Sequence, residues 1–123
     1  MTGNIRTDGG PDTINLLAGT LSGNLFENND PNTTTSLRND VVLVSGTVTV
    51  GGDIGTGAGE DTILLVSGKQ IGGDVNAGDG NDLIELKGDV GLSGTIDGGS
   101  GNDTLVVFSG AVAADVDLSL IHI

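Results

Sequence analysis

Aspartate recurs at an interval of 21 residues along most of this chain. The repeated positions are Asp40, Asp61, Asp82 and Asp103, and an apolar run follows each of them. Asp12 begins a fifth copy, 28 residues before Asp40. A period of this length indicates stacked repeats, in which each unit buries its apolar face only against its neighbours.

Alignment of the copies gives four vertical columns of aliphatic residues. The columns are Ile63, Ile84 and Leu105; Leu65, Leu86 and Val107; Val50, Ile71 and Leu92; and Ile54, Val75 and Ile96. Apolar residues alternate with period two within each run, which predicts strands, and no apolar stripe of helical period persists. We therefore expect an all-β fold, a right-handed parallel β-helix or β-roll solenoid with about 21 residues per coil and about 4.8 Å between coils.

The repeat also predicts the organisation of the chain. We expect residues 1–117 to form a single β-solenoid segment of five coils, cut from the interior of a longer protein, because neither end has the polar character of a cap. The extra length of the first repeat lies between Leu25 and Asp40, where the polar stretch from Glu27 to Thr35 predicts a bulging loop. Residues 118–123 resemble the translation of a common sequencing-adapter end, so we interpret them, with the lone His122, as an artefact.

Composition excludes several classes of function. A net charge of -13 would repel both nucleic acid and anionic membrane surfaces. The sequence contains no span long enough for a membrane helix and no recognisable signal peptide. It has no Cys, Trp or Tyr and only four cationic residues, so a thiol nucleophile and a carbohydrate-stacking platform are both missing. We therefore predict that this chain is not an enzyme.

The glycine-rich turns before the repeated aspartates carry the clearest motif. Residues 98–106 match every fixed position of the nonapeptide G-G-x-G-x-D-x-U-x, where U is a large apolar residue. Residues 77–85 and 56–64 keep every fixed position except the first glycine, at the same phase of the coil. Three copies in register resemble the calcium-binding repeats of the RTX, or hemolysin-type, family.

That resemblance implies calcium ions between successive turns, held by aspartate carboxylates and loop carbonyls. The residues that it places at the metal are Asp61, Asp82, Asp103, Gly57, Gly59, Gly78, Gly80, Gly99 and Gly101. The chemistry agrees, since Ca²⁺ takes six to eight oxygen ligands and glycine allows the positive φ that turns carbonyls inward. The chain departs from the family in spacing, because RTX coils of about 18 residues hold two nonapeptides and these coils hold one. Only one edge of the solenoid could therefore bind metal.

A second interpretation needs no metal. The coils are also similar to those of autotransporter passengers and bacterial adhesins, which form parallel β-helices as structural stalks. In that case each aspartate would accept hydrogen bonds from its own turn, two residues on, while asparagines at the preceding position form a ladder. These asparagines are Asn39, Asn81 and Asn102. Under either interpretation, we predict that the aspartates of the opposite turns, Asp53, Asp74 and Asp115, are solvated.

The expected function is thus a non-catalytic calcium-binding repeat module of a secreted or surface-displayed bacterial protein, and the alternative is a metal-independent β-helical stalk. The expected location is extracellular or on the bacterial surface. The expected partners are calcium ions, neighbouring repeats of the parent chain, and a host-surface or matrix ligand.

Overall fold

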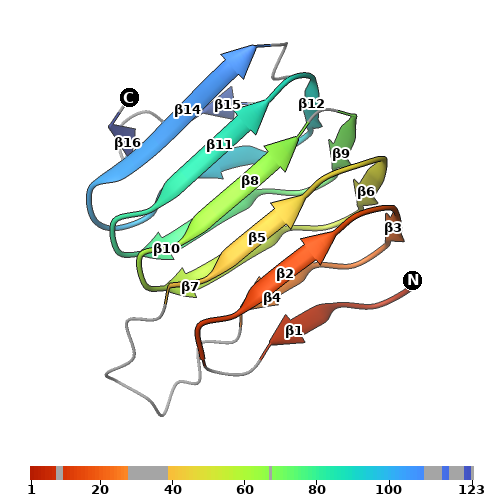
Figure 1. The fold of residues 1–123 in the computed structure, drawn as a ribbon, viewed down its shortest axis with the longest axis horizontal. Coiled ribbons are helices and arrows are strands. Elements are labelled where there is room, and N and C mark those ends of the chain that lie inside the picture. The colour runs from red at the N-terminus through yellow and green to blue at the C-terminus, as the bar shows by residue number, and fades with distance from the viewer. Residues whose placement is uncertain (8–9, 28–38, 67, 110–114, 117–120, 123) are drawn as a thin grey trace.

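The chain forms a solenoid of parallel strands that wind around one axis (Figure 1). A computed structural model describes residues 1–7, 10–27, 39–66, 68–109, 115–116 and 121–122. These residues contain three parallel sheets and no helix. The predicted all-β solenoid is confirmed.

Each complete coil contributes one strand to each of three sheets, A, B and C. Sheet A contains, in order, β1 (Ile5–Thr7), β4 (Leu25–Glu27), β7 (Ile54–Ala58), β10 (Val75–Asp79), β13 (Thr95–Asp97) and β15 (Asp115–Val116). Sheet B contains β2 (Thr13–Leu16), β5 (Val41–Val44), β8 (Thr62–Val66), β11 (Leu83–Lys87), β14 (Asp103–Ser109) and β16 (Ile121–His122). Sheet C contains β3 (Gly19–Leu21), β6 (Val48–Val50), β9 (Lys69–Ile71) and β12 (Val90–Leu92).

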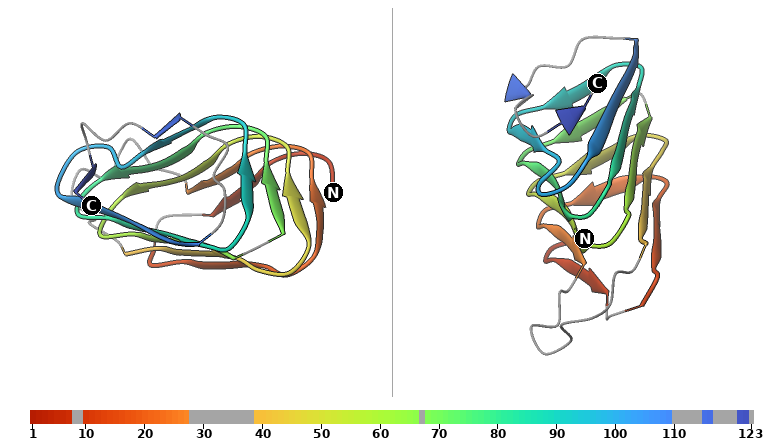
Figure 2. Two further views of the ribbon diagram at one scale, coloured as in Figure 1. Left: turned by 90° about the horizontal axis from the view of Figure 1, so that it is seen from above. Right: turned by 90° about the vertical axis from the view of Figure 1, so that its left-hand side faces the viewer.

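The strand register reproduces the 21-residue repeat of the sequence. Ile63 pairs with Ile84 in sheet B, Val75 with Ile54 in sheet A, and every such step spans one repeat. Strands β5 to β13 make three complete coils at this spacing. The chain runs along sheet B at the front, crosses through sheet C and returns along sheet A behind while it rises, so the solenoid is right-handed (Figures 1 and 2).

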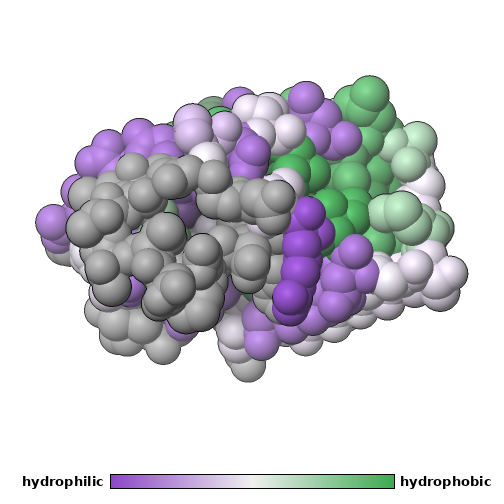
Figure 3. All heavy atoms as spheres, turned by 90° about the horizontal axis from the view of Figure 1, so that it is seen from below, coloured by the Kyte–Doolittle hydropathy of each residue, from purple (hydrophilic) through white to green (hydrophobic). Residues whose placement is uncertain are grey.

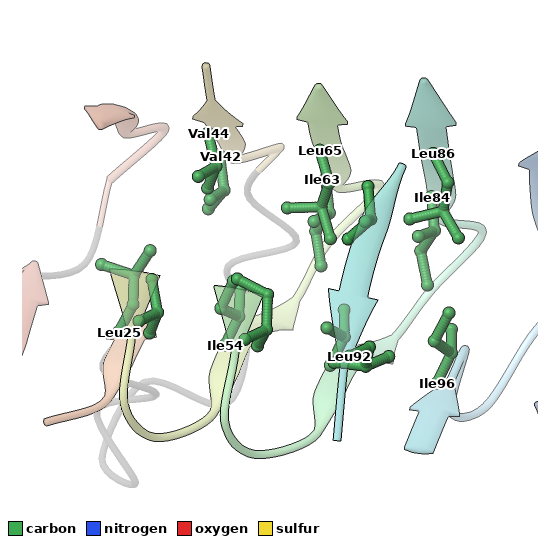
Figure 4. Close-up of a cluster of buried hydrophobic side chains, with 14 of the residues drawn as sticks. Leu25, Val42, Val44, Ile54, Ile63, Leu65, Ile84, Leu86, Leu92 and Ile96 are labelled. Carbon is green, nitrogen blue, oxygen red and sulfur yellow. The ribbon is translucent and has the colours of Figure 1, made fainter. Parts of the chain in front are cut away.

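The four predicted columns line the interior. In β8 the buried and partly exposed residues alternate strictly, and this pattern repeats in β11. Side chains from sheets A and B face one another across the axis, as Ile54 and Val42 do in Figure 4, and these two are 0% and 1% exposed. A core built from such layers is continuous only when coils stack, because each coil buries its aliphatic side chains against the next.

One member of the predicted columns does not lie in the core. Val107 is 48% exposed, although its partner Leu86 is fully buried. The register of β11 and β14 shifts after this pair, since Lys87 is opposite Ser109 instead of the residue next to Val107. The irregularity lies at the last long strand of the stack, where Val107 and Phe108 are both exposed.

The first coil contains the extra residues where they were predicted. Leu25 in β4 pairs with Ile54 and Val41 in β5 pairs with Thr13, so the additional length lies between β4 and β5. Most of the predicted loop, residues 28–35, lies outside the described part of the chain. Ile5 in β1 and Ile14 and Leu16 in β2 are only partly buried. Apolar surface is visible when the molecule is seen from below, the end at which these first strands lie (Figure 3).

The last residues of the chain are only partly described. Ile121 and His122 pair with Asp103 and Thr104 as strand β16. Residues 118–120 and 123 lie outside the described residues. The interpretation of residues 118–123 as an artefact therefore stays a prediction.

Candidate metal site in the stacked turns

The predicted metal-binding turns connect sheet A to sheet B at one edge of the solenoid. All six glycines that the motif singles out have positive φ: Gly57 (104°), Gly59 (158°), Gly78 (110°), Gly80 (142°), Gly99 (89°) and Gly101 (132°). Residues with a side chain rarely adopt this conformation, so the repeated glycines are required by the path of the backbone.

Close stacking requires the same glycines independently. A Cβ atom at Gly78 would overlap the carbonyl oxygen of Gly57, and one at Gly99 would overlap that of Gly78. The second row repeats this contact, with Gly80 above the carbonyl of Gly59. The turns therefore approach one another more closely than a side chain at these positions permits.

The repeated aspartates point into the solenoid. Asp61, Asp82 and Asp103 have relative exposures of 1%, 3% and 0%. Since strand residues alternate between faces, an aspartate two positions before Ile63 lies on the same inward face as that core residue. The three carboxylates form a buried aspartate column at the edge of the aliphatic core.

One oxygen of each carboxylate in this column bonds the coil before it. The Asp61 Oδ1 accepts a hydrogen bond from the Asp40 N–H (2.8 Å), and Asp82 Oδ1 accepts one from the Asp61 N–H (2.8 Å). Asp103 Oδ1 accepts the Asp82 N–H at 3.0 Å. The acceptors thus lie one coil away from their donors, so the prediction that these aspartates cap their own turns is wrong. Asp97 makes that local bond instead, accepting the N–H of Gly99 at 2.8 Å.

The other oxygen of each carboxylate has no partner. The Oδ2 atoms of Asp61, Asp82 and Asp103 are buried and receive no hydrogen bond, and Asp12 Oδ2 shares this property. A buried acceptor without a donor costs about 1–3 kcal/mol, and more when it is charged. In each carboxylate of the column, the described protein atoms therefore provide a hydrogen-bond donor for Oδ1 but none for Oδ2.

Burial raises the pKa of two members of the column. Loss of hydration raises the pKa of Asp82 to about 6; the Asp61 N–H works against this shift, and the charges of Asp61, Asp103 and Asp79 add to it. Burial also raises the pKa of Asp61, against the opposing effect of the Asp40 N–H and the Thr56 hydroxyl. A cation between the turns would oppose this rise in pKa, because a positive charge close to a buried carboxylate stabilises its ionised form.

The residues present fit a calcium ion in part of its coordination shell. Two buried, unpartnered carboxylate oxygens in successive coils are hard anionic ligands, which Ca²⁺ prefers. No group of three or more His, Cys, Asp or Glu side chains gathers anywhere in the described ranges. A calcium ion at these turns would therefore depend on backbone carbonyls and water for its remaining ligands.

The exposed side of these turns carries part of the predicted asparagine ladder, which Glu60 interrupts between Asn39 and Asn81. Asn81 Oδ1 accepts the N–H of Asn102 at 2.9 Å, and Asn39 Oδ1 accepts the N–H of Glu60 at 3.1 Å. Asp79 accepts the hydroxyl of Ser100 at 2.7 Å. These contacts hold the outer surface of the turns in register and do not involve the buried aspartates.

The opposite turns form a third ladder, which composition alone did not indicate. Asp53 Oδ1 accepts the N–H of Asp74 (2.9 Å), and Asp74 Oδ1 accepts the N–H of Thr95 (2.7 Å). Asp74 is exposed, in agreement with the prediction, but its carboxylate has a structural bond as well as solvent. The Asp115 side chain, for which the same prediction was made, lies outside the described part of the structure.

Comparison with protein-family models, with curated proteins and with solved structures finds no match for this chain.

Proposed function

We propose that this chain is a non-catalytic calcium-binding repeat module. The observation that carries the proposal is the buried aspartate column, in which each of three carboxylates has one oxygen without a partner. Glycine conformation and glycine packing are explained by stacking alone. The unpartnered charge is not, and a divalent cation is the simplest group that accounts for it.

The energetic argument follows from the distance between coils. Two carboxylates separated by one strand spacing repel by roughly 1 kcal/mol in water and by about 3–4 kcal/mol at the effective dielectric of a protein. A divalent ion shared between the two carboxylates would replace their mutual repulsion with attraction to the ion. Calcium would therefore stabilise the stack, and the solenoid would be stiffer with the ion than without it.

The proposal extends to the setting in which the module works. Extracellular calcium modules bind with dissociation constants on the order of 10⁻⁴–10⁻³ M, which suits a secreted or surface-displayed bacterial protein. A net charge of -13 and the absence of Cys are compatible with that setting. Among the described residues, none forms a helix that is both long enough and apolar enough to span a membrane. In this proposal the partners are calcium, neighbouring repeats and a host-surface or matrix ligand.

A metal-independent stalk is the second candidate, and one observation favours it. Each Oδ1 in the column already binds a backbone N–H of the preceding coil, so the aspartates help to hold the register without any ion. Such a stalk would belong to an autotransporter passenger or adhesin. In this candidate the carboxylates remain protonated, or bear the cost of their burial.

Paired alanine variants of the full chain test the calcium function. Asp82 and Asp74 each accept a backbone N–H from the neighbouring coil, and Asp74 also accepts the Thr95 hydroxyl, but Asp82 is buried with a free oxygen and Asp74 is exposed. Thermal melting is followed by circular dichroism after chelator treatment and again in millimolar CaCl₂. Calcium is expected to raise the melting temperature of the wild type and of Asp74→Ala, and to leave Asp82→Ala unchanged.

The same melting curves separate the two candidates. A wild-type curve that is identical in chelator and in millimolar CaCl₂ would favour the metal-independent stalk. An Asp82→Ala variant that keeps the full calcium response would place the ion elsewhere.

A further inference from the structure

The three sheets differ in what they present to solvent. In the complete coils, the described strand residues of sheets A and C that are not buried are all small or polar. They are Gly55, Gly57, Ala58, Asn76, Gly78, Asp79, Thr95 and Asp97 in sheet A, and Thr49, Gln70 and Gly91 in sheet C. This is the usual composition of a strand face that meets water, because apolar side chains lie on the buried face.

Sheet B carries large apolar side chains on its outward face instead. Val41 and Phe108 are 38% and 58% exposed, and the others are partly exposed. All of them come from the neighbouring strands β5, β8, β11 and β14, which run side by side across the front of Figure 1. Together they form the sheet B patch: Val41, Leu43, Leu64, Val66, Leu83, Val106 and Phe108.

The size and shape of the sheet B patch suit contact with another sheet. Neighbouring strands lie about 4.8 Å apart and each residue extends a strand by about 3.3 Å, so the patch covers roughly 300 Å². Apolar patches of about this size are the largest that ordinary monomers expose, and they often mark interaction sites. The faces of two sheets pack about 10 Å apart through interdigitated side chains.

The charge of the sheet B patch differs from that of the whole chain. The net charge is -13, yet the outward charged residues of these four strands are Glu85 and Lys87, which form an ion pair at 3.0 Å. Lys87 Nζ also lies 5.0 Å from the centre of the Phe108 ring. The patch is therefore neutral, and exposed carboxylates such as Asp74 lie in the turns at the strand ends. Two copies of the chain can meet at this face without bringing their acidic turns together.

We propose that the sheet B patch is a contact surface between two copies of this chain, paired face to face about a two-fold axis. Glu85 and Lys87 lie two residues apart on β11, so both point outward. A two-fold axis along the solenoid, level with Leu86, reverses the strand direction and places Glu85 of each copy opposite Lys87 of the other. This pair is thus complementary to itself, as a two-fold interface requires.

Apolar contacts continue the same pairing in the adjacent coil. Leu64 and Val66 of β8 are in register with Glu85 and Lys87 of β11, so the same axis places Leu64 of each copy opposite Val66 of the other. The contact area is about 600 Å² for the two copies together, well below the roughly 1,200 Å² of a stable specific interface. Association is therefore weak and reversible, with a dissociation constant on the order of 10⁻⁴–10⁻³ M.

Sedimentation equilibrium of the chelator-treated full chain, at protein concentrations up to about 1 mM, measures this association. The mean mass is expected to rise toward that of a dimer as concentration increases. The rise should be larger in 1 M NaCl than in 0.1 M NaCl, because salt shortens the range of repulsion between two acidic chains from about 10 Å to about 3 Å.

Substitutions on the outward face test where the copies meet. Thr62→Val adds an apolar side chain between Val41 and Leu83 and should lower the dissociation constant by about threefold, the effect of burying one more methyl group. Thr49→Val makes the same change on the outward face of sheet C and is the control, which should leave the constant unchanged. Leu64→Thr combined with Leu83→Thr should raise it by about tenfold or more. Circular dichroism checks that each variant keeps its β-content.

A charge exchange tests the two-fold arrangement. In 0.1 M NaCl, Lys87→Glu places like charges opposite one another and should raise the dissociation constant by about tenfold. Glu85→Lys combined with Lys87→Glu keeps both the net charge and the self-complementary pair, so it should restore the constant to within about threefold of the wild type. A double variant as weak as Lys87→Glu alone would contradict the two-fold pairing.

The position of the contact is read from amide and methyl NMR shifts between dilute and concentrated samples. Shifts are expected on the outward residues of β8 and β11. A chain that stays monomeric at about 1 mM in 1 M NaCl would overturn the proposal. Shifts confined to β1, β2 and β3, or equal effects of Thr62→Val and Thr49→Val, would overturn it as well. All of these measurements are made in chelator, so their outcome is independent of the calcium function.

Discussion

Asparagine at position 82 separates the charge of the buried column from its hydrogen bond. Asp82→Asn keeps the size of the side chain and the Oδ1 acceptor for the Asp61 N–H, but it removes the carboxylate. Burial raises the pKa of Asp82 from 3.8 to about 6. At about 1.4 kcal/mol per pKa unit, the ionised side chain costs the metal-free fold about 3 kcal/mol at neutral pH. That shift already includes the favourable hydrogen bond from the Asp61 N–H, so Asp82→Asn should raise the free energy of unfolding by about 2–3 kcal/mol.

The sign of the pH dependence follows from the direction of the shift. Because the pKa of Asp82 is higher in the folded chain, the folded state holds this proton more tightly than the unfolded state does. The contribution of Asp82 to stability is therefore complete below about pH 4 and is lost as the pH rises through about 6. Asp82→Asn lacks this loss, so the difference between variant and wild type should grow across the same interval.

Urea denaturation in chelator, followed by circular dichroism at steps from about pH 4 to pH 7, measures that difference. Asp74→Asn, at an exposed carboxylate with a similar intercoil bond, is the control and should change stability by less than about 1 kcal/mol. An Asp82→Asn variant that is less stable than the wild type at pH 7, or a difference that shrinks as the pH rises, would refute the argument from the buried charge.

Two further substitutions test the stacking itself, each by thermal or urea denaturation in chelator. Gly80→Ala places a Cβ on the carbonyl oxygen of Gly59 at a φ of 142°, and should cost at least about 2 kcal/mol, whereas Gly68→Ala, at positive φ but with open space around it, should cost about 1 kcal/mol. Equal costs would show that intercoil contact does not explain the glycine rows. Ile84→Ala, in the fully buried column, should cost about 2–5 kcal/mol, against less than about 2 kcal/mol for Leu64→Ala on the outward face of β8. A larger loss at Leu64 would contradict the assignment of the inward face.

The coil and its core could be predicted from the sequence because both depend on periodicity. Side chains in stacked parallel strands lie above one another, so a repeat of Asp61 at Asp82 and Asp103 fixes the register of every coil between them. The same rule predicted the inward columns. It failed for Val107, where the register shifts at the end of the stack and no repeat in the sequence indicates it.

The sequence predicted which residues lie in the candidate site, but it did not predict that their carboxylates are buried. The glycines and aspartates are where the motif places them, yet the burial of Asp61 was missed. The signal was present, since Asp61, Ile63 and Leu65 alternate on one face. The bonds between coils could not be predicted, because the direction in which each carboxylate leans, back toward Asp40 or forward toward the next turn, depends on backbone geometry that spacing does not specify.

Calcium anomalous diffraction from crystals grown in millimolar CaCl₂ tests the central claim most directly. The proposed function predicts an anomalous peak between the turns of Asp82 and Asp103, at about 2.3–2.6 Å from the Oδ2 atom of each. Well-ordered turns without such a peak, with both Oδ2 atoms in contact with protein or water alone, would contradict it.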